Sequence, residues 1–139
     1  MTIMGSVTWF YGDIQPTVAD PAYNPDDIDA YNADLDVALC IYGPNPIYES
    51  DDPYLGLITD NENLPAFFLV AGMQDTINAQ YDNVKLAESV MDKTMVESHT
   101  FANAGHGFGI GVEGTNSMKW VELADCFIDQ AIAAKLAAG

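Results

Sequence analysis

Two residues in the second half of the sequence have the types and surroundings needed for proton transfer, a histidine and an aspartate. His106 lies between Gly105 and Gly107, directly after a run typical of a strand. Glycines adopt backbone angles that other residues avoid, so this pattern presents an imidazole from a tight loop. Asp75 follows the apolar run of residues 64–72 and a short turn. A strand–loop–Asp unit before a strand–loop–His unit supplies two members of a nucleophile–base–acid relay.

Apolar strands that alternate with one-sided helices must position these two residues. Strands are predicted over residues 36–42, 66–71 and 95–101, with a further strand-like run at residues 1–4. Helices are predicted over residues 79–92 and 116–138. Their apolar stripes consist of Val84, Ala87, Val90 and Met91 in the first helix, and Val121, Ala124, Ile128, Ala131 and Ile132 in the second. This alternation predicts an α/β fold with a parallel three- to four-stranded sheet flanked by helices.

The composition narrows the range of partners. A chain of 139 residues is the size of one domain, and its formal net charge of −17 comes from 21 acidic residues against 4 lysines. Such a surface repels nucleic acid and anionic membranes and disfavours phosphate ligands. No apolar run is long enough to span a membrane, and the N-terminus lacks the basic start of a signal peptide. We therefore expect a cytoplasmic protein if this N-terminus is native.

Several motifs in the order of the chain resemble a known family. Leu64-Pro, an apolar strand and Ala71-Gly-x-x-Asp75 precede an amphipathic helix, Val96-Glu-Ser-His-Thr-Phe101 and Ala104-Gly-His-Gly-Phe-Gly109. Together with residues 19–44, this arrangement resembles the α/β-hydrolases, and within them the acetyl-esterase/lipase and xylan-esterase-like branch. The resemblance runs from about residue 19 to the C-terminus. It implies that Asp75 is the acid and His106 the general base, with no cofactor.

The nucleophile of that family is a serine in a Gly-x-Ser-x-Gly turn after the fifth strand, and the corresponding place here is Thr2-Ile-Met-Gly-Ser-Val-Thr-Trp9. Gly5 matches the first glycine, but the serine position falls on Val7, and Ser6 lies one residue out of register. The resemblance makes Ser6 the provisional nucleophile, with backbone amides near Gly5 and Val7 as oxyanion donors. The alternative is that Ser6 caps a short helix.

The family's first four strands and its oxyanion loop have no counterpart in the sequence. We therefore expect residues 1–139 to form a single truncated α/β-hydrolase-like domain, equivalent to strands five to eight. The sheet edge left without a neighbour predicts a homodimer or higher oligomer.

The other residues with chemical potential have structural explanations. His99 lies within a predicted strand, and Asp82, the fallback for Asp75, is typical of a helix N-terminal charge. Cys40 and Cys126 lack metal-site spacing and are expected to be buried free thiols. A metal site that includes both histidines is disfavoured, because no two ligands lie at helical spacing.

Two functions follow from these patterns. The first is hydrolysis of short-chain or acetyl esters, a small-molecule substrate class, through a serine-linked acyl-enzyme. The alternative is a catalytically inactive hydrolase half that acts as an oligomeric or partner-binding domain.

Overall fold

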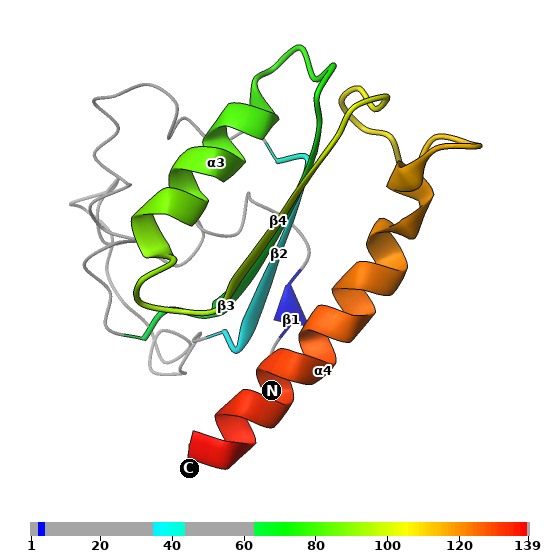
Figure 1. Ribbon diagram of the computed structural model, residues 1–139. Helices are drawn as coiled ribbons and strands as arrows, with labels where there is room; N and C mark the ends of the chain where they lie inside the picture. The colour runs from blue at the N-terminus through cyan, green and yellow to red at the C-terminus, as the bar shows by residue number, and fades with distance from the viewer. Residues whose placement is uncertain (1–2, 5–34, 44–62, 139) are drawn as a thin grey trace, which may run out of the picture.

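A parallel sheet forms the middle layer of the molecule, and one helix covers each of its faces (Figure 1). The computed structural model describes residues 3–4, 35–43 and 63–138. The strands are β1 (Ile3–Met4), β2 (Val37–Ile41), β3 (Ala66–Gly72) and β4 (Val96–Phe101). The helices are α3 (Ala79–Val90), the 3₁₀ turn η2 (Asn116–Lys119) and α4 (Trp120–Ala138). The predicted α/β class with a parallel sheet between helices is confirmed.

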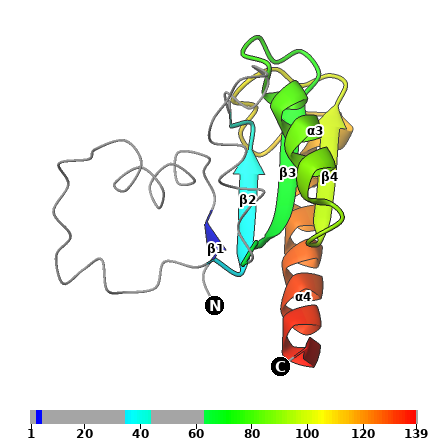
Figure 2. The same ribbon diagram turned by 90° about the vertical axis from the view of Figure 1, so that its left-hand side faces the viewer.

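The strands lie side by side in the order β1-β2-β3-β4, and every neighbouring pair is parallel (Figure 2). The register pairs Ile41 with Val70 and Gly72 with Phe101. Parallel strands place all their carboxyl ends at one edge of the sheet, where ligands bind in open α/β folds. The loops after β2, β3 and β4 therefore begin at the same end of the molecule.

Alternation along the strands divides the core between the two helices. Phe67 and Leu69 of β3 belong to the cluster that packs on α3, whereas Phe68 and Val70 belong to the cluster that packs on α4. All four side chains are fully buried. A strand with both faces covered needs an apolar residue at every position, which is why residues 66–71 read as a continuous apolar run.

The buried faces of both helices differ from the predicted stripes. In α4 the buried residues are Ala124, Phe127 and Ala131, while Val121 is 47% exposed. The predicted stripe omitted Phe127, which lies three residues after Ala124 and four before Ala131 and so belongs to the same face. In α3 the predicted Ala87 and Val90 are buried, but Val84 is 56% exposed, and Met91, which follows the helix as its C-cap, is 60% exposed. The buried face also includes Asn83 and Leu86, which the predicted stripe omitted.

The two cysteines also differ from the expectation. Cys40 in β2 is a buried free thiol, as predicted, but Cys126 in α4 is exposed. Cys126 directly precedes Phe127, and the two side chains project from different sides of the helix. Within the described residues, no helix is long and apolar enough to cross a membrane.

Candidate functional site

Two loops at the carboxyl end of the sheet contact each other through their backbones. The Met73 N–H donates to the Phe101 carbonyl at 2.9 Å, and the Gln74 N–H donates to the Ala104 carbonyl at 2.9 Å. Gly72 makes this approach possible, since a Cβ atom there would lie 2.1 Å from the Ala104 carbonyl oxygen. The loop after β3 and the loop after β4 are therefore fixed against each other by atoms that every residue carries.

Asp75 is held inside the first of these loops. Its side chain is 0% exposed, and its Oδ1 accepts a hydrogen bond from the Ile77 N–H at 2.8 Å. Its own N–H donates to the Gly72 carbonyl at 3.1 Å, which closes the turn. A buried carboxylate is costly unless its oxygens are satisfied, and the Ile77 amide satisfies only one of them. The second oxygen, Oδ2, needs a donor from outside the loop.

His106 provides that donor from the second loop. Its Nδ1 lies 3.0 Å from Asp75 Oδ2, although the two residues are 31 positions apart in the sequence. Because a carboxylate only accepts hydrogen bonds, Nδ1 carries the proton, and in the neutral imidazole Nε2 is left with its lone pair. No hydrogen bond to Nε2 is found within the described residues, and the side chain is 39% exposed. The predicted partnership of Asp75 and His106 is present in the structure.

An aromatic residue that the sequence analysis did not single out completes the surroundings of His106. Tyr42, directly after β2, meets the imidazole at a centroid distance of 5.5 Å and an interplanar angle of 75°. It meets the ring of Phe108 at 5.1 Å and 66°. Its φ of 40° is left-handed, a conformation that costs a non-glycine residue about 1 kcal/mol or more. The sequence offered one signal that Tyr42 could belong to the site, namely its position at the end of an apolar, buried strand.

The remaining predicted site residues lie apart from this pair or outside the described residues. Ser6, Gly5 and Val7 are outside the described residues. Asp82 lies in the first turn of α3, as predicted for a helix N-terminal charge, and is buried. His99 lies within β4, where its Nε2 is 2.7 Å from Glu97 Oε1.

Other hydroxyl groups near the start of the last helix have structural partners. Ser117 is 1% exposed, and its Oγ accepts a hydrogen bond from the Val112 N–H at 2.8 Å. Within the part of the chain that the structure describes, no hydroxyl or thiol forms a hydrogen bond with His106, and no group of three His, Cys, Asp or Glu residues is placed to hold a metal ion.

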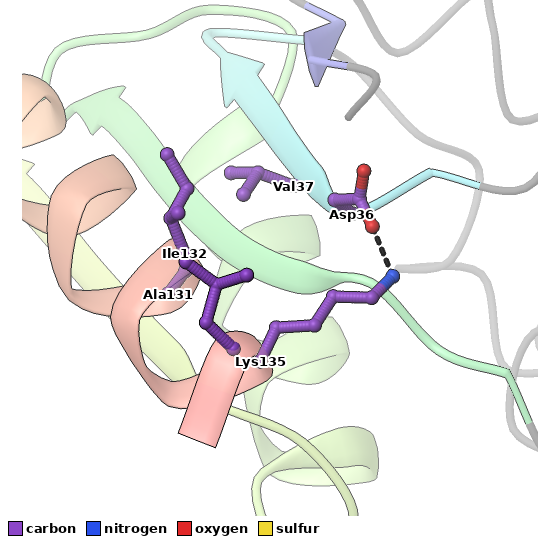
Figure 3. Close-up of a pocket in the computed structure, with 6 residues that line it drawn as sticks. Asp36, Val37, Ala131, Ile132 and Lys135 are labelled. Carbon is purple, nitrogen blue, oxygen red and sulfur yellow. Dashed lines mark hydrogen bonds and ion pairs between the residues drawn. The ribbon is translucent and has the colours of Figure 1, made fainter. Parts of the chain in front are cut away.

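A small apolar cavity lies at the opposite end of the sheet (Figure 3). It has a volume of about 220 Å³ and is lined by Val37 at the start of β2 and by Ala131, Ile132 and Leu136 of α4. The ion pair between Lys135 and Asp36 borders it. Since β2 runs from Val37 towards Tyr42, this cavity is separated from His106 by the length of the strand.

The fold is similar to that of a solved hydrolase, although the sequence is not. No protein-family model and no curated protein matches the chain. The crystal structure of an acetyl ester-xyloside bifunctional hydrolase from Caldicellulosiruptor lactoaceticus superposes with a TM-score of 0.67 and 14% sequence identity, over 92% of this chain and 55% of that one. The chain thus spans little more than half the length of the hydrolase that it matches. What this likeness shows is a hydrolase-like α/β fold.

Proposed function

We propose that the protein is a carboxylic-ester hydrolase of short-chain or acetyl esters, with His106 as general base and Asp75 as its orienting acid. The observation that carries the proposal is the 3.0 Å contact between His106 Nδ1 and the fully buried Asp75 carboxylate. This contact leaves the Nε2 lone pair of a partly exposed imidazole at the carboxyl end of a parallel sheet, the edge where such folds place their chemistry.

In the proposed reaction, His106 Nε2 removes the proton from a serine hydroxyl as the hydroxyl oxygen attacks the ester carbonyl. The resulting imidazolium is stabilised by the Asp75 carboxylate, which stays ionised. Collapse of the tetrahedral intermediate breaks the bond to the alcohol, and the imidazolium returns the proton to that leaving group. Water, activated by the same Nε2, then releases the carboxylic acid from the serine.

We propose Ser6 as the nucleophile, with the backbone amides near Gly5 and Val7 as oxyanion donors. The sequence resemblance supports this assignment, and so does the direction of β1. That strand is parallel to β2, so its carboxyl end at Met4 faces the same edge of the sheet as Tyr42 and the His106 loop. One oxyanion donor is worth about 10²–10³ in rate, so a site with amides from this segment alone is expected to turn over slowly.

A second candidate is a hydrolase half without catalysis, which acts through an oligomeric or partner contact at the sheet edge. This candidate is favoured by the sequence around Ser6, which lacks the Gly-x-Ser-x-Gly turn of the family that the chain resembles. It also agrees with a chain that covers 55% of the solved hydrolase.

Labelling with a fluorophosphonate, followed by intact-mass measurement and peptide mapping, separates the two candidates. The ester hydrolase predicts a stoichiometric adduct on one serine, which is lost in His106→Gln and retained in His99→Gln. An adduct on Ser6 that disappears in Ser6→Ala confirms the nucleophile, whereas an adduct on another serine reassigns it. If the folded chain forms no adduct, the ester-hydrolase proposal is wrong and the second candidate stands.

A further inference from the structure

Tyr42 occupies a backbone conformation that a glycine adopts more easily. Among the described residues, Tyr42 and Asn78 are the only non-glycine residues with positive φ, at 40° and 66°. Asn78 has an evident local reason, since it caps the start of α3 and asparagine tolerates this region. Tyrosine does not share this tolerance. The glycine at position 43 does not help, because the positive φ belongs to Tyr42 itself. Residues held in such conformations cluster at functional sites.

The backbone around Tyr42 explains how its ring reaches the site. The Tyr42 N–H donates to the Val70 carbonyl at 2.6 Å, one residue beyond the last paired position of β2. The amide is thus still part of the sheet, while the left-handed φ turns the chain out of the strand direction. The half-buried ring then contacts residues of the loop after β4, which lies two strands away.

The loop residues on the other side of this contact are also positioned by left-handed backbone. Phe108 lies between Gly107 and Gly109, whose φ values are 68° and 57°. A Cβ atom at either glycine would meet no atom within 4 Å, so these glycines are required for the path of the chain and not for space. Phe108 in turn contacts Phe101 at 6.2 Å in an edge-on arrangement. His106 and Phe108 are therefore presented from the same loop, and both meet the Tyr42 ring in edge-on arrangements.

We propose that Tyr42 is a positioning residue whose ring fixes the orientation of the His106 imidazole. The ring is attached at Cγ and hydrogen-bonded at Nδ1, so it can still pivot through coupled rotation about the Cα–Cβ and Cβ–Cγ bonds while the contact with Asp75 is kept. The Tyr42 ring, at 75° to the imidazole, blocks this pivot and keeps Nε2 directed to one place. The contacts of Tyr42 with His106 and Phe108 are ring contacts, and we therefore assign the effect to the ring. This positioning of His106 can be tested whether or not the protein hydrolyses esters. Only its benefit to catalysis, through Nε2 as the general base, rests on the proposed function.

The chain contains two histidines, so one substitution makes His106 observable alone. In a His99→Gln background, nitrogen-15 and proton NMR of the imidazole report its tautomer and the exchange rate of the Nδ1 proton. Tyr42→Phe keeps the ring and removes the hydroxyl. Tyr42→Gly and Tyr42→Asn remove the ring and suit the left-handed backbone, so both are expected to fold. Dispersion of the backbone amide spectrum verifies that they do.

We expect the Nδ1 proton to exchange at the same rate in the parent and in Tyr42→Phe, and at least tenfold faster in both ring-deletion variants. Unchanged exchange in folded Tyr42→Gly and Tyr42→Asn would overturn the proposal. Equal acceleration in Tyr42→Phe would show that the hydroxyl is responsible, which also contradicts it. If the parent hydrolyses esters, kcat should fall about tenfold in the ring-deletion variants with KM unchanged. A parent without activity disproves ester hydrolysis while the NMR result still decides the role of Tyr42.

Discussion

The molecule contains two histidine–carboxylate pairs, and they differ in almost every respect except bond length. His99 and Glu97 are two residues apart on one strand, so they share a face of β4 by the strand's own periodicity. Their side chains are 27% and 35% exposed. His106 and Asp75 come from different loops, and the Asp75 carboxylate is fully buried. The distances, 2.7 Å and 3.0 Å, give no indication of which pair has a function.

The difference shows what the surrounding fold supplies to the pair that we propose to be catalytic. A pair in contact with solvent, such as His99 and Glu97, gains at most about 0.2–1 kcal/mol and needs only two neighbouring side chains. A buried carboxylate needs its second oxygen satisfied, a turn that closes around it and a loop that delivers the histidine. The two imidazoles also use different ring nitrogens, since His99 contacts its carboxylate through Nε2 and His106 through Nδ1. The distinguishing property is therefore the backbone that holds the pair.

The largest effect expected from this comparison is on catalysis. Asp75→Asn replaces an acceptor by an amide that can donate to His106, which favours the tautomer with its lone pair on Nδ1. We expect kcat for ester hydrolysis to fall by about 10³–10⁴. Glu97→Gln is the matched change at the other pair and should leave kcat unchanged. Equal losses in the two variants would remove the distinction between the pairs.

A second substitution disrupts the close contact between the loop after β3 and the loop after β4. The His106–Asp75 pair depends on this contact, whereas the His99–Glu97 pair does not. Gly72→Ala places a Cβ atom 2.1 Å from the Ala104 carbonyl oxygen, and we expect it to lower the free energy of unfolding by roughly 3 kcal/mol or more. Gly105→Ala is the control, because its Cβ atom would have no neighbour closer than 3.8 Å. Urea denaturation measures both. Similar stabilities for the two variants would show that the loops can separate at little cost.

The buried thiol of Cys40 makes the stability of the fold depend on pH above about 9, and the two imidazoles are best compared below that pH. Burial raises the pKa of its thiol from 9.0 to about 12. The unfolded chain loses this proton near pH 9 while the folded chain retains it. The stability that results is present below pH 9 and is lost as the pH rises towards 12, by about 1.4 kcal/mol per pH unit. Denaturation between pH 8 and 11 should show a shallower decline in Cys40→Ala; identical slopes would contradict this origin.

The smallest effect is expected at the partly buried pair of His99 and Glu97. His99→Gln removes the imidazole contact with Glu97, and the free energy of unfolding should change by no more than about 0.5 kcal/mol. Its ring also stacks on Phe101 at 6.0 Å, so a larger loss would mean that this histidine contributes mainly through packing. Thermal denaturation together with the rate of ester hydrolysis tests both aspects.

The sequence predicted the strands and the Asp75–His106 pair because both depend on local signals. A continuous apolar run identifies a strand covered on two faces, and a glycine-framed histidine identifies a loop. The buried face of α4 was harder, since apolar residues occur all around that helix and Val121 and Phe127 are equally apolar. Only the contact with β3, where Phe127 meets Phe68, decides which of them is buried.

Tyr42 was missed for a different physical reason. An aromatic residue at the end of an apolar run is indistinguishable from core packing until the neighbouring strands are in register. Its left-handed φ leaves no trace in the sequence, because residues that favour this conformation are glycine and asparagine. The contact with His106 spans more than sixty positions of chain and arises only from the parallel order β2-β3-β4.

The backbone bonds between the two loops also have a consequence for engineering. Since Met73 and Gln74 contact the other loop through their amides, their exposed side chains and that of Asn103 are not needed to hold His106 in place. These three positions lie on the two loops that hold Asp75 and His106 and can be randomised together in a library, with Gly72 kept constant. The chain thus combines exposed, replaceable side chains with a backbone contact that depends on Gly72 alone, which suits directed evolution of a new substrate preference.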